Sequence, residues 1–340
     1  MVETIGSPVL WAATLAVLLG LLVTDFVITH RPHDVPMREA VRWTVFYLTL
    51  PVAFGLLLWP LYGGTVSMEF FTGWVVEKSL SVDNLFVFML LLAAFAVPPA
   101  LAQRVLLYGI VGALVLRAVF IALGAAVISA GSWAFLVFGA ILLVTAAKVM
   151  RDAVSGHEQA VDIDAMRSVR LLRRLMPVTT DFEGAKLTVR RAGRRALTPM
   201  ALVVVAVFMT DIVFAVDSVP AVYGVTEDPY IVFATNAFAL LGLRALYFVL
   251  HNALSRLRHL NHGLAIILAF IGVKLVLHWA HKVWSPVPDV PTPLSLAVIL
   301  GVLTTVTITS IRANRREERA ALTAAESAPA PVSRAAGRSR

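Results

Sequence analysis

The sequence predicts an all-α fold, a polytopic membrane helix bundle of about nine transmembrane helices. Of its 340 residues, 59% are apolar and only 15% are charged, and the mean hydropathy of +0.83 lies outside the range of soluble globular proteins. The apolar residues fall in runs of about 20, which is the length of helix that crosses a bilayer. The chain contains no cysteine, so disulfides, thiolate metal sites and cysteine nucleophiles are excluded.

Nine apolar runs of membrane length follow one another along the chain. They cover residues 8–28, 43–62, 69–97, 105–128, 133–150, 199–222, 230–251, 262–281 and 294–311. The first run has no positively charged flank before it and no small-residue cleavage site after it, so we expect a retained helix rather than a signal peptide. Without a transit peptide, the expected location is the plasma membrane, with multiple passes.

The basic residues alternate between the two sides of such a bundle. With nine spans, 23 of the 29 Lys and Arg residues fall in segments on one side, whereas the segments on the other side contain only Lys282. Because positively charged loops stay cytoplasmic, this asymmetry predicts an outer N-terminus and a cytoplasmic C-terminus. The pI of about 10.2 therefore reflects membrane topology, and we do not expect nucleic-acid binding.

A single transmembrane domain is expected over residues 1–311, with repeat one at about 69–150 and repeat two at about 199–281. Between the repeats lies a basic cytoplasmic loop, 151–198. We favour a topology signal as the role of its arginine clusters, and binding of anionic lipid is the alternative. The tail, 312–340, is rich in Ala, Ser, Pro and Arg, so we expect it to be disordered and cytoplasmic.

Charged residues inside the spans reveal the internal repeat. The third run contains Glu77-Lys-Ser-Leu-Ser-Val-Asp83-Asn84, and the sixth contains Asp211-Ile-Val-Phe-Ala-Val-Asp217-Ser218. Each motif is a carboxylate, five residues, an Asp and a small polar side chain. The next runs carry Arg117 and Arg244, each within Leu-Arg-Ala, and the runs after those carry Lys148 and Lys274 near their ends. Offsets of 134, 127 and 126 residues indicate one duplicated unit of three helices.

Two copies of a three-helix unit cross the membrane in opposite directions, which predicts inverted repeats. The carboxylates then lie near the bilayer midplane, where four without partners would cost about 10 kcal/mol. Six residues of helix separate the acids of each motif by about 120° and about 9 Å, too far for one ion to reach both from a straight helix. Either these helices are interrupted, for which Pro220 gives one reason, or one acid binds an ion while the other pairs with Arg117 or Arg244.

Oxygen-bearing side chains near the midplane form a candidate metal site. The set comprises Glu77, Asp83, Asn84, Asp211, Asp217, Ser218 and Asn236, with Arg117 and Arg244 as charge partners. Hard divalent cations prefer such ligands, which favours Mn²⁺, Mg²⁺ or Ca²⁺ over Zn²⁺ or Cu⁺. An ion pair that only locks helices together is the alternative. We favour an ion because four acids against two central arginines leave negative charge that a cation would neutralise.

Other polar residues of the spans are interpreted as structural. Lys78 is expected to extend outward and Lys274 to anchor a span end. Asp25 and Glu69 are expected at the membrane interface and at a solvated edge, respectively. Five histidines lie near span ends rather than with the acids, and we expect none of them to be a ligand. They are His251, His259, His262, His278 and His281.

Four stretches carry a family resemblance. They are residues 71–88, 210–221, 236–248 and 270–274, and the similarity extends over most of 11–311. The first reads FTGWVVEKSLSVDNLFVF and the second TDIVFAVDSVPA. In these stretches the chain resembles the TerC family of integral membrane proteins, which is named for tellurium resistance. The resemblance implies a transporter of the LysE type with two inverted three-helix units, linked to manganese efflux and metal homeostasis.

The resemblance also implies roles for individual residues. The family's acidic and amide positions fall on Glu77, Asp83, Asn84, Asp211, Asp217 and Asn236. Family members often have Glu three residues before the position of Asp211, where this chain has Phe208. That departure implies a difference in ion affinity or coupling. Tellurite itself is not the expected substrate, because an oxyanion would meet an acid-rich site.

We therefore expect a transporter that exports a divalent metal cation, Mn²⁺ first, through a midplane carboxylate site by alternating access. Protonation of one carboxylate would couple export to proton entry. The alternative is a non-transporting membrane scaffold that assists assembly or insertion of envelope proteins. No HExxH or GxSxG motif is present, so we do not expect an enzyme, and we expect no prosthetic group. The expected partners are the cation and the lipid bilayer, and the sequence does not predict an oligomeric state.

Overall fold

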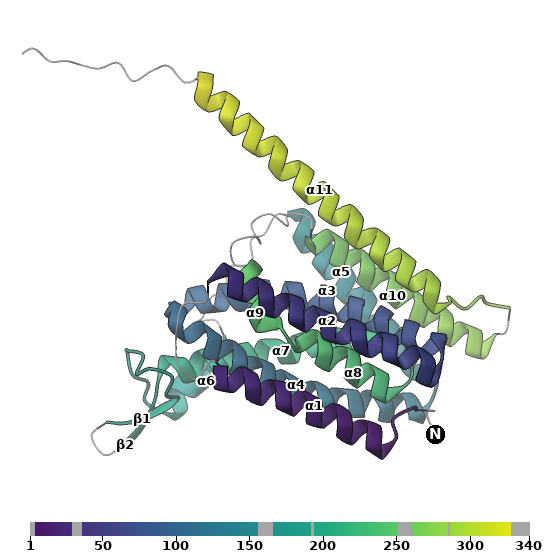
Figure 1. Ribbon diagram of the computed structural model, residues 1–340, viewed down its shortest axis with the longest axis horizontal. Helices are drawn as coiled ribbons and strands as arrows, with labels where there is room; N and C mark the ends of the chain where they lie inside the picture. The colour runs from purple at the N-terminus through teal and green to yellow at the C-terminus, as the bar shows by residue number, and fades with distance from the viewer. Residues whose placement is uncertain are drawn as a thin grey trace, which may run out of the picture.

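The computed structural model is a bundle of long helices, which confirms the all-α membrane fold (Figure 1). It describes residues 4–28, 36–155, 166–191, 194–250, 260–284 and 286–327. The helices are α1 (Pro8–Ile28), α2 (Met37–Tyr62), α3 (Gly64–Ala94), α4 (Pro99–Ala130), α5 (Trp133–Ser155), α6 (Arg167–Leu175), α7 (Pro199–Tyr223), α8 (Pro229–Leu240), α9 (Leu243–Leu250), α10 (Leu260–Val283) and α11 (Thr292–Ser327). Strands β1 (Thr188–Arg191) and β2 (Arg194–Leu197) form one antiparallel hairpin.

Eight segments of the described chain are long and apolar enough to cross a membrane. They are α1, α2, α4, α5, α7, α8 together with α9, α10, and the first part of α11. Helix α3 has 31 residues, about 46 Å of helix, and packs against α2, α7 and α8. It carries Glu69, Glu77, Lys78 and Asp83, and these charges set it apart from the eight in composition. We count it as the ninth span.

Helix α8 lies at the centre of the bundle, where all eleven residues from Tyr230 to Leu240 are buried. It begins at Asp228, whose side chain accepts a hydrogen bond from Tyr230 N at 2.8 Å. It ends before Gly242, which has φ +79, a backbone conformation that favours glycine. A Cβ added at Gly242 would lie 2.5 Å from Cβ of Tyr47. The span expected at 230–251 is therefore broken into α8 and α9 beside α2.

The tightest helix pair is α5 with α10. A Cβ added at Gly139 would lie 2.9 Å from the carbonyl oxygen of Gly272, and one added at Gly272 would lie 3.1 Å from that of Gly139. Small residues at such a crossing let two backbones approach, which is the usual way that membrane helices gain van der Waals contact. The last helices of the two expected repeats are therefore packed directly on each other.

The packing of the other repeat helices fits a twofold relation. Helix α3 packs on α8, and α4 packs on α7. A twofold axis that exchanges the first and second helices of the two repeats would turn one of these pairs into the other. Contacts of α3 with α7, α4 with α8 and α5 with α10 are each compatible with the same axis. The inverted orientation of the repeats remains a prediction.

One of the two alternatives for the acidic helices and one expected helix end differ from the structure. The helices that carry the acidic motifs are continuous: α3 runs through Asp83, and α7 contains Pro220 in its last turn and ends at Tyr223. A proline this close to the helix C-terminus does not interrupt the segment that precedes it. Helix α11 was expected to end near 311 but continues to Ser327, because the segment Ala313–Ser327 is rich in the helix formers Ala, Arg and Glu. Residues 328–340 lie outside the described part.

The two ends of the bundle differ in chemistry. Figure 1 shows the N-terminus at one end and α6 with the β1–β2 hairpin at the other. The hairpin and α6 contain most of the arginines of the loop 151–198, and residues 156–165 of that loop lie outside the described chain. Helix α6 buries Val169 and exposes Arg170, Arg173 and Arg174. We call the end of the bundle that carries the N-terminus the N-terminal end, and the end that carries α6 and the hairpin the hairpin end.

Candidate functional site

A buried cluster of charges joins three helices in the bundle. Arg117 of α4 forms ion pairs with Glu77 of α3 and with Asp211 of α7, the latter at 3.6 Å between Nη2 and Oδ1. The three side chains are 1%, 0% and 2% exposed, respectively. Burial of this kind is tolerated only when charges compensate one another. The first acid of each sequence motif therefore meets the same arginine.

Helix α8 adds a fourth member to the cluster. Arg117 Nη1 donates a hydrogen bond to Oδ1 of Asn236 at 2.8 Å, and Nδ2 of Asn236 donates to the carbonyl oxygen of Val232 at 2.9 Å. The latter contact fixes which end of the amide faces the guanidinium. Asp217 is half-buried and is close enough to Arg117 to interact with it electrostatically. Of the expected ligands, Glu77, Asp211, Asp217 and Asn236 thus surround one arginine.

Helical spacing decides which motif residues share a face. On α3, Glu77 and Asn84 are seven residues apart and lie on one side, and they are 0% and 3% exposed. On α7, Asp211 and Ser218 have the same spacing and are both buried. Each motif thus buries its first acid together with its last polar residue. Asp217, six residues after Asp211 on α7, is turned away by about 120° and is less buried.

Several oxygens on these faces lack hydrogen-bond partners within the described structure. They include Glu77 Oε2, Asp211 Oδ2 and Ser218 Oγ, together with Ser81 Oγ. Ser81 is fully buried and lies one helical turn after Glu77 on the same face of α3. Its spacing of four residues from Glu77 was the sequence signal that would have identified it. Buried acceptors of this kind are rare in proteins and require an explanation.

The acids are not already arranged as a metal centre. Among the described side chains, no three His, Asp or Glu residues lie close enough to hold one ion. The side chain of Asp83 lies outside the described part, although its backbone belongs to α3. Phe208, the departure noted in the family resemblance, packs over Gly112 of α4, since a Cβ at Gly112 would lie 2.8 Å from its ring.

Arg244 has a different partner from the one that the sequence indicates. Its Nε and Nη2 donate to the two carboxylate oxygens of Asp25 at 3.0 and 2.5 Å, and Nη1 donates to Gln103 at 3.2 Å. Tyr47 donates to the same carboxylate at 3.2 Å. Asp25 was expected at the interface but is only 6% exposed. Its interaction with Arg244 joins residues 219 positions apart, so sequence spacing gave no sign of it.

Lys78 also differs from expectation. It does not extend outward but donates a hydrogen bond to the carbonyl oxygen of Ala239 at 3.1 Å. That carbonyl belongs to the last turn of α8, where helical hydrogen bonds run out and cations are favoured. Lys78 therefore stabilises the end of α8 at the break before Gly242.

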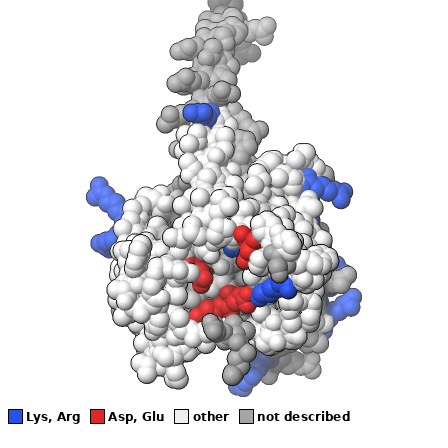
Figure 2. Space-filling view, turned by 90° about the vertical axis from the view of Figure 1, so that its right-hand side faces the viewer, with Lys and Arg blue, Asp and Glu red and all other residues white. Residues whose placement is uncertain are grey.

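A second charged region lies at the N-terminal end of the bundle. A cavity of about 810 Å³ opens there, lined by the acids Glu69, Glu227, Asp228 and Asp289 and by Lys274. Figure 2 shows acidic side chains gathered around this hollow. Glu69 accepts a hydrogen bond from Thr226 at 2.7 Å. We call this space the N-terminal cavity.

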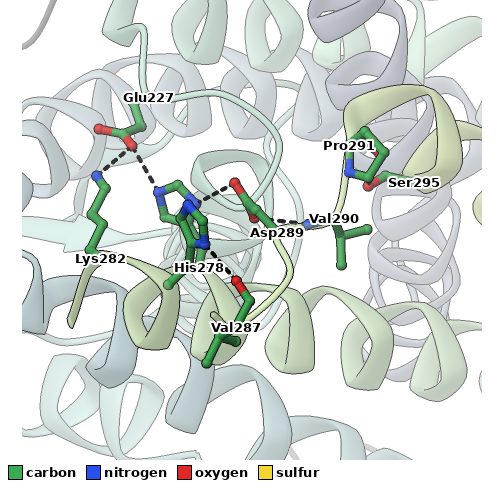
Figure 3. A network of polar contacts seen from close by, with 9 residues as sticks. Glu227, His278, Lys282, Val287, Asp289, Val290, Pro291 and Ser295 are labelled. Carbon is green, nitrogen blue, oxygen red and sulfur yellow. Dashed lines mark hydrogen bonds and ion pairs between the residues drawn. The ribbon is translucent and has the colours of Figure 1, made fainter. Parts of the chain in front are cut away.

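His278 connects two loops at the rim of the N-terminal cavity (Figure 3). Its Nε2 lies 3.1 Å from Glu227 and its Nδ1 lies 3.0 Å from Asp289. Lys282 Nζ donates to the same Glu227 oxygen at 2.8 Å. Hydrogen bonds from His278 and then Lys282 lower the pKa of the Glu227 carboxyl to about 2, against the opposing effect of burial. His278 thus lies with acids, although not with those of the midplane, and His251 and His259 lie outside the described residues.

Comparison with known proteins places the chain in a family. Residues 62–318 match the Integral membrane protein TerC family. The chain belongs to the TerC family. The match covers α3 to α10 and α11 as far as residue 318, and so includes every member of the Arg117 cluster, whereas Asp25 of α1 lies before it.

Relatives of this TerC protein extend over nearly its whole length. Proteins of Salmonella typhi and Escherichia coli (strain K12), both named "Putative membrane-bound redox modulator Alx", are 37% identical to it over 328 residues, which is 93% of this chain and 98% of each relative. An uncharacterized membrane protein of Mycobacterium tuberculosis is 40% identical over 305 residues, 87% of this chain and 77% of its own. No solved structure matches the chain.

Proposed function

We propose that this TerC protein is a membrane transporter that exports a divalent cation, with Mn²⁺ as the first candidate. The observation that supports this most strongly is the Arg117 cluster, in which acids from both motifs converge on one buried arginine. Ionisable groups inside a membrane bundle are costly and usually mark an ion or proton pathway. These groups come from helices of both predicted repeats, and secondary transporters built from such repeats bind substrate between them.

The charge balance of the cluster supports an ion of charge two. Glu77, Asp211 and Asp217 contribute three negative charges when ionised, and Arg117 contributes one positive charge. A surplus of two negative charges follows. A divalent cation would neutralise it, and the unpaired oxygens of Glu77, Asp211 and Ser218 are the hard ligands that Mn²⁺, Mg²⁺ and Ca²⁺ prefer.

Binding of a cation would compete with Arg117 for the same carboxylates. In this structure the guanidinium holds Glu77 and Asp211. A cation bound to the unpaired oxygens of both acids would place positive charge beside the guanidinium and weaken its ion pairs, which would loosen the tie between α3, α4 and α7. Such a change in helix packing is the kind of two-state step that alternating access requires. With the hairpin end cytoplasmic, as the positive-inside rule predicts, the N-terminal end faces outward.

The test is Mn²⁺ flux into and out of proteoliposomes that contain the purified protein. Wild type is compared with Asp211→Asn and Glu77→Gln, which remove charge while keeping shape. Asp181→Asn makes the same change at an exposed site in the hairpin-end loop and serves as the matched control. We expect flux in wild type and in the control, and loss of flux in the two cluster variants. Flux retained in folded Asp211→Asn would overturn the proposal.

A membrane scaffold is the second candidate, because the Arg117 cluster also ties three helices together. Its prediction is opposite: folded wild-type protein shows no flux with Mn²⁺, Mg²⁺ or Ca²⁺. The name of the Alx relatives raises a third role, in redox modulation. Since the chain has no cysteine, any such role here proceeds without a thiol of its own.

A further inference from the structure

The N-terminal cavity holds a buried ammonium group that the Arg117 cluster does not use. Lys274 of α10 lines the cavity and is only 7% exposed. It interacts electrostatically with Glu69 of α3 and with Asp289 of the loop before α11. Within the described structure it makes no hydrogen bond or ion pair of close geometry. A positive charge is therefore held inside the cavity chiefly by the field of these two acids.

The other acids of the cavity are engaged elsewhere. Asp228 accepts hydrogen bonds from Thr4 at 2.6 Å, from Ile5 N at 2.8 Å and from Tyr230 N at 2.8 Å, so it fixes the start of α8. Glu227 is bound by His278 and Lys282. Glu69 and Asp289 are the acids that interact electrostatically with Lys274. Glu69 also accepts a hydrogen bond from Thr226, and Asp289 contacts His278 and accepts a hydrogen bond from Val290 N.

We propose that the N-terminal cavity is a second cation-binding site, in which Lys274 occupies the place of the cation until a divalent ion displaces it. Glu69 and Asp289 would be the protein ligands. Two carboxylates suffice for a hydrated ion, because Mg²⁺ and similar hard cations keep several of their waters. A cavity of about 810 Å³ has room for an ion with its water shell.

A tethered lysine gives this site a defined property. It neutralises the acids when no ion is bound, so the cavity avoids an uncompensated charge. It also competes with an incoming cation, which keeps binding weak, as release to the outside requires. Removing the ammonium should therefore strengthen cation binding, whereas removing a ligand acid should weaken it. If Lys274 were purely structural, removing its ammonium would not strengthen cation binding and removing an acid would not weaken it.

Lys148 provides a matched control within the chain. It holds the position in α5 that corresponds to Lys274 in α10, but it is exposed. Lys148→Met and Lys274→Met make the same chemical change at equivalent places of the two repeats. Only the second faces acids in a cavity.

The chain contains no cysteine, so a thiol-reactive label attaches only where a cysteine is introduced. A label placed at the cavity therefore reports cation binding there. A single cysteine introduced at Thr292, which lines the cavity, takes a nitroxide label in nanodisc-embedded full-length protein. Added Mn²⁺ broadens the nitroxide spectrum when it binds nearby, and a label at Thr180 in the hairpin-end loop reports binding elsewhere. We expect Lys274→Met to lower the dissociation constant at the Thr292 label by about tenfold or more and Glu69→Gln to raise it by a similar factor.

Lys148→Met should leave the dissociation constant unchanged. An equal constant in wild type, Lys274→Met and Glu69→Gln would overturn the inference, and Lys274→Gln is the second variant should the methionine variant not fold. The inference rests on the proposed cation transport, but the two fail separately. If Mn²⁺ flux does not depend on Asp211 but the broadening still depends on Lys274, only the transport mechanism is refuted. Flux that depends on Asp211, with broadening insensitive to Lys274 and Glu69, would refute only the second site.

Discussion

Replacing Arg117 by methionine tests whether its buried ion pairs are formed as described. Methionine keeps much of the side-chain volume but leaves Glu77 and Asp211, which are 0% and 2% exposed, without their cation. Breaking a buried pair by removing one partner costs about 3–5 kcal/mol. At about 2 °C per kcal/mol for a large chain, the melting temperature should fall by about 6–10 °C.

The assay is thermal unfolding of detergent-solubilised protein, followed by intrinsic tryptophan fluorescence. Arg312→Met is the control, because Arg312 is exposed on α11, and it should melt within about 1 °C of wild type. Adding Glu77→Gln to Arg117→Met removes one of the two carboxylates that are left without a cationic partner. We expect this double variant to melt above Arg117→Met, and Glu77→Gln alone completes the double-mutant cycle that gives the coupling between the two side chains.

Two outcomes would refute the reasoning. If Arg117→Met melts within 2 °C of wild type, about the effect of a single kcal/mol, Arg117 does not compensate buried charge. If the double variant melts no higher than Arg117→Met, the Glu77 carboxylate without its partner is not the source of the lost stability.

Three further predictions concern other parts of the molecule. Gly139→Ala should destabilise the protein by about 1–3 kcal/mol, because the new Cβ would lie 2.9 Å from the Gly272 carbonyl oxygen. Gly20→Ala is the control: its Cβ meets nothing within 4 Å, so it should show no loss of stability in the same melting assay. Gly242→Ala should cost about 1–3 kcal/mol, since φ is +79 and the new Cβ would lie 2.5 Å from Tyr47; a melting temperature equal to that of wild type would mean that the α8–α9 break is not strained. For Glu227, a folded-state pKa of about 2 against an ordinary 4.5 means that its contacts stabilise above pH 4.5 and lose this effect as pH falls toward 2. Melting scans over that window should therefore show a smaller loss in Glu227→Gln than in wild type.

The linear order of residues determined the spans and the buried acids, and it indicates an internal repeat. Hydropathy and charge are local properties, and a carboxylate within an apolar run is costly wherever the run folds. Glu77 and Asp211 were therefore predicted as candidate site residues without coordinates, and the structure buries both beside Arg117. Helical periodicity likewise places Asn84 with Glu77 and Ser218 with Asp211. The same reasoning located Arg117 as a charge partner of the motif acids.

Only the tertiary structure decided which charges meet. Both arginines occupy the same place in the repeat, yet Arg117 pairs with the motif acids and Arg244 pairs with Asp25 of α1. The sequence cannot distinguish them, because the choice depends on how the helices pack together: α4 lies on α7, while α9 contacts α2, α3 and α4. The N-terminal cavity is a stronger case, since Glu69, Lys274 and Asp289 come from distant segments that only helix packing brings together. Charge in a membrane protein is thus predictable from the chain, but its partner depends on three-dimensional proximity, because electrostatic energy depends on distance in space.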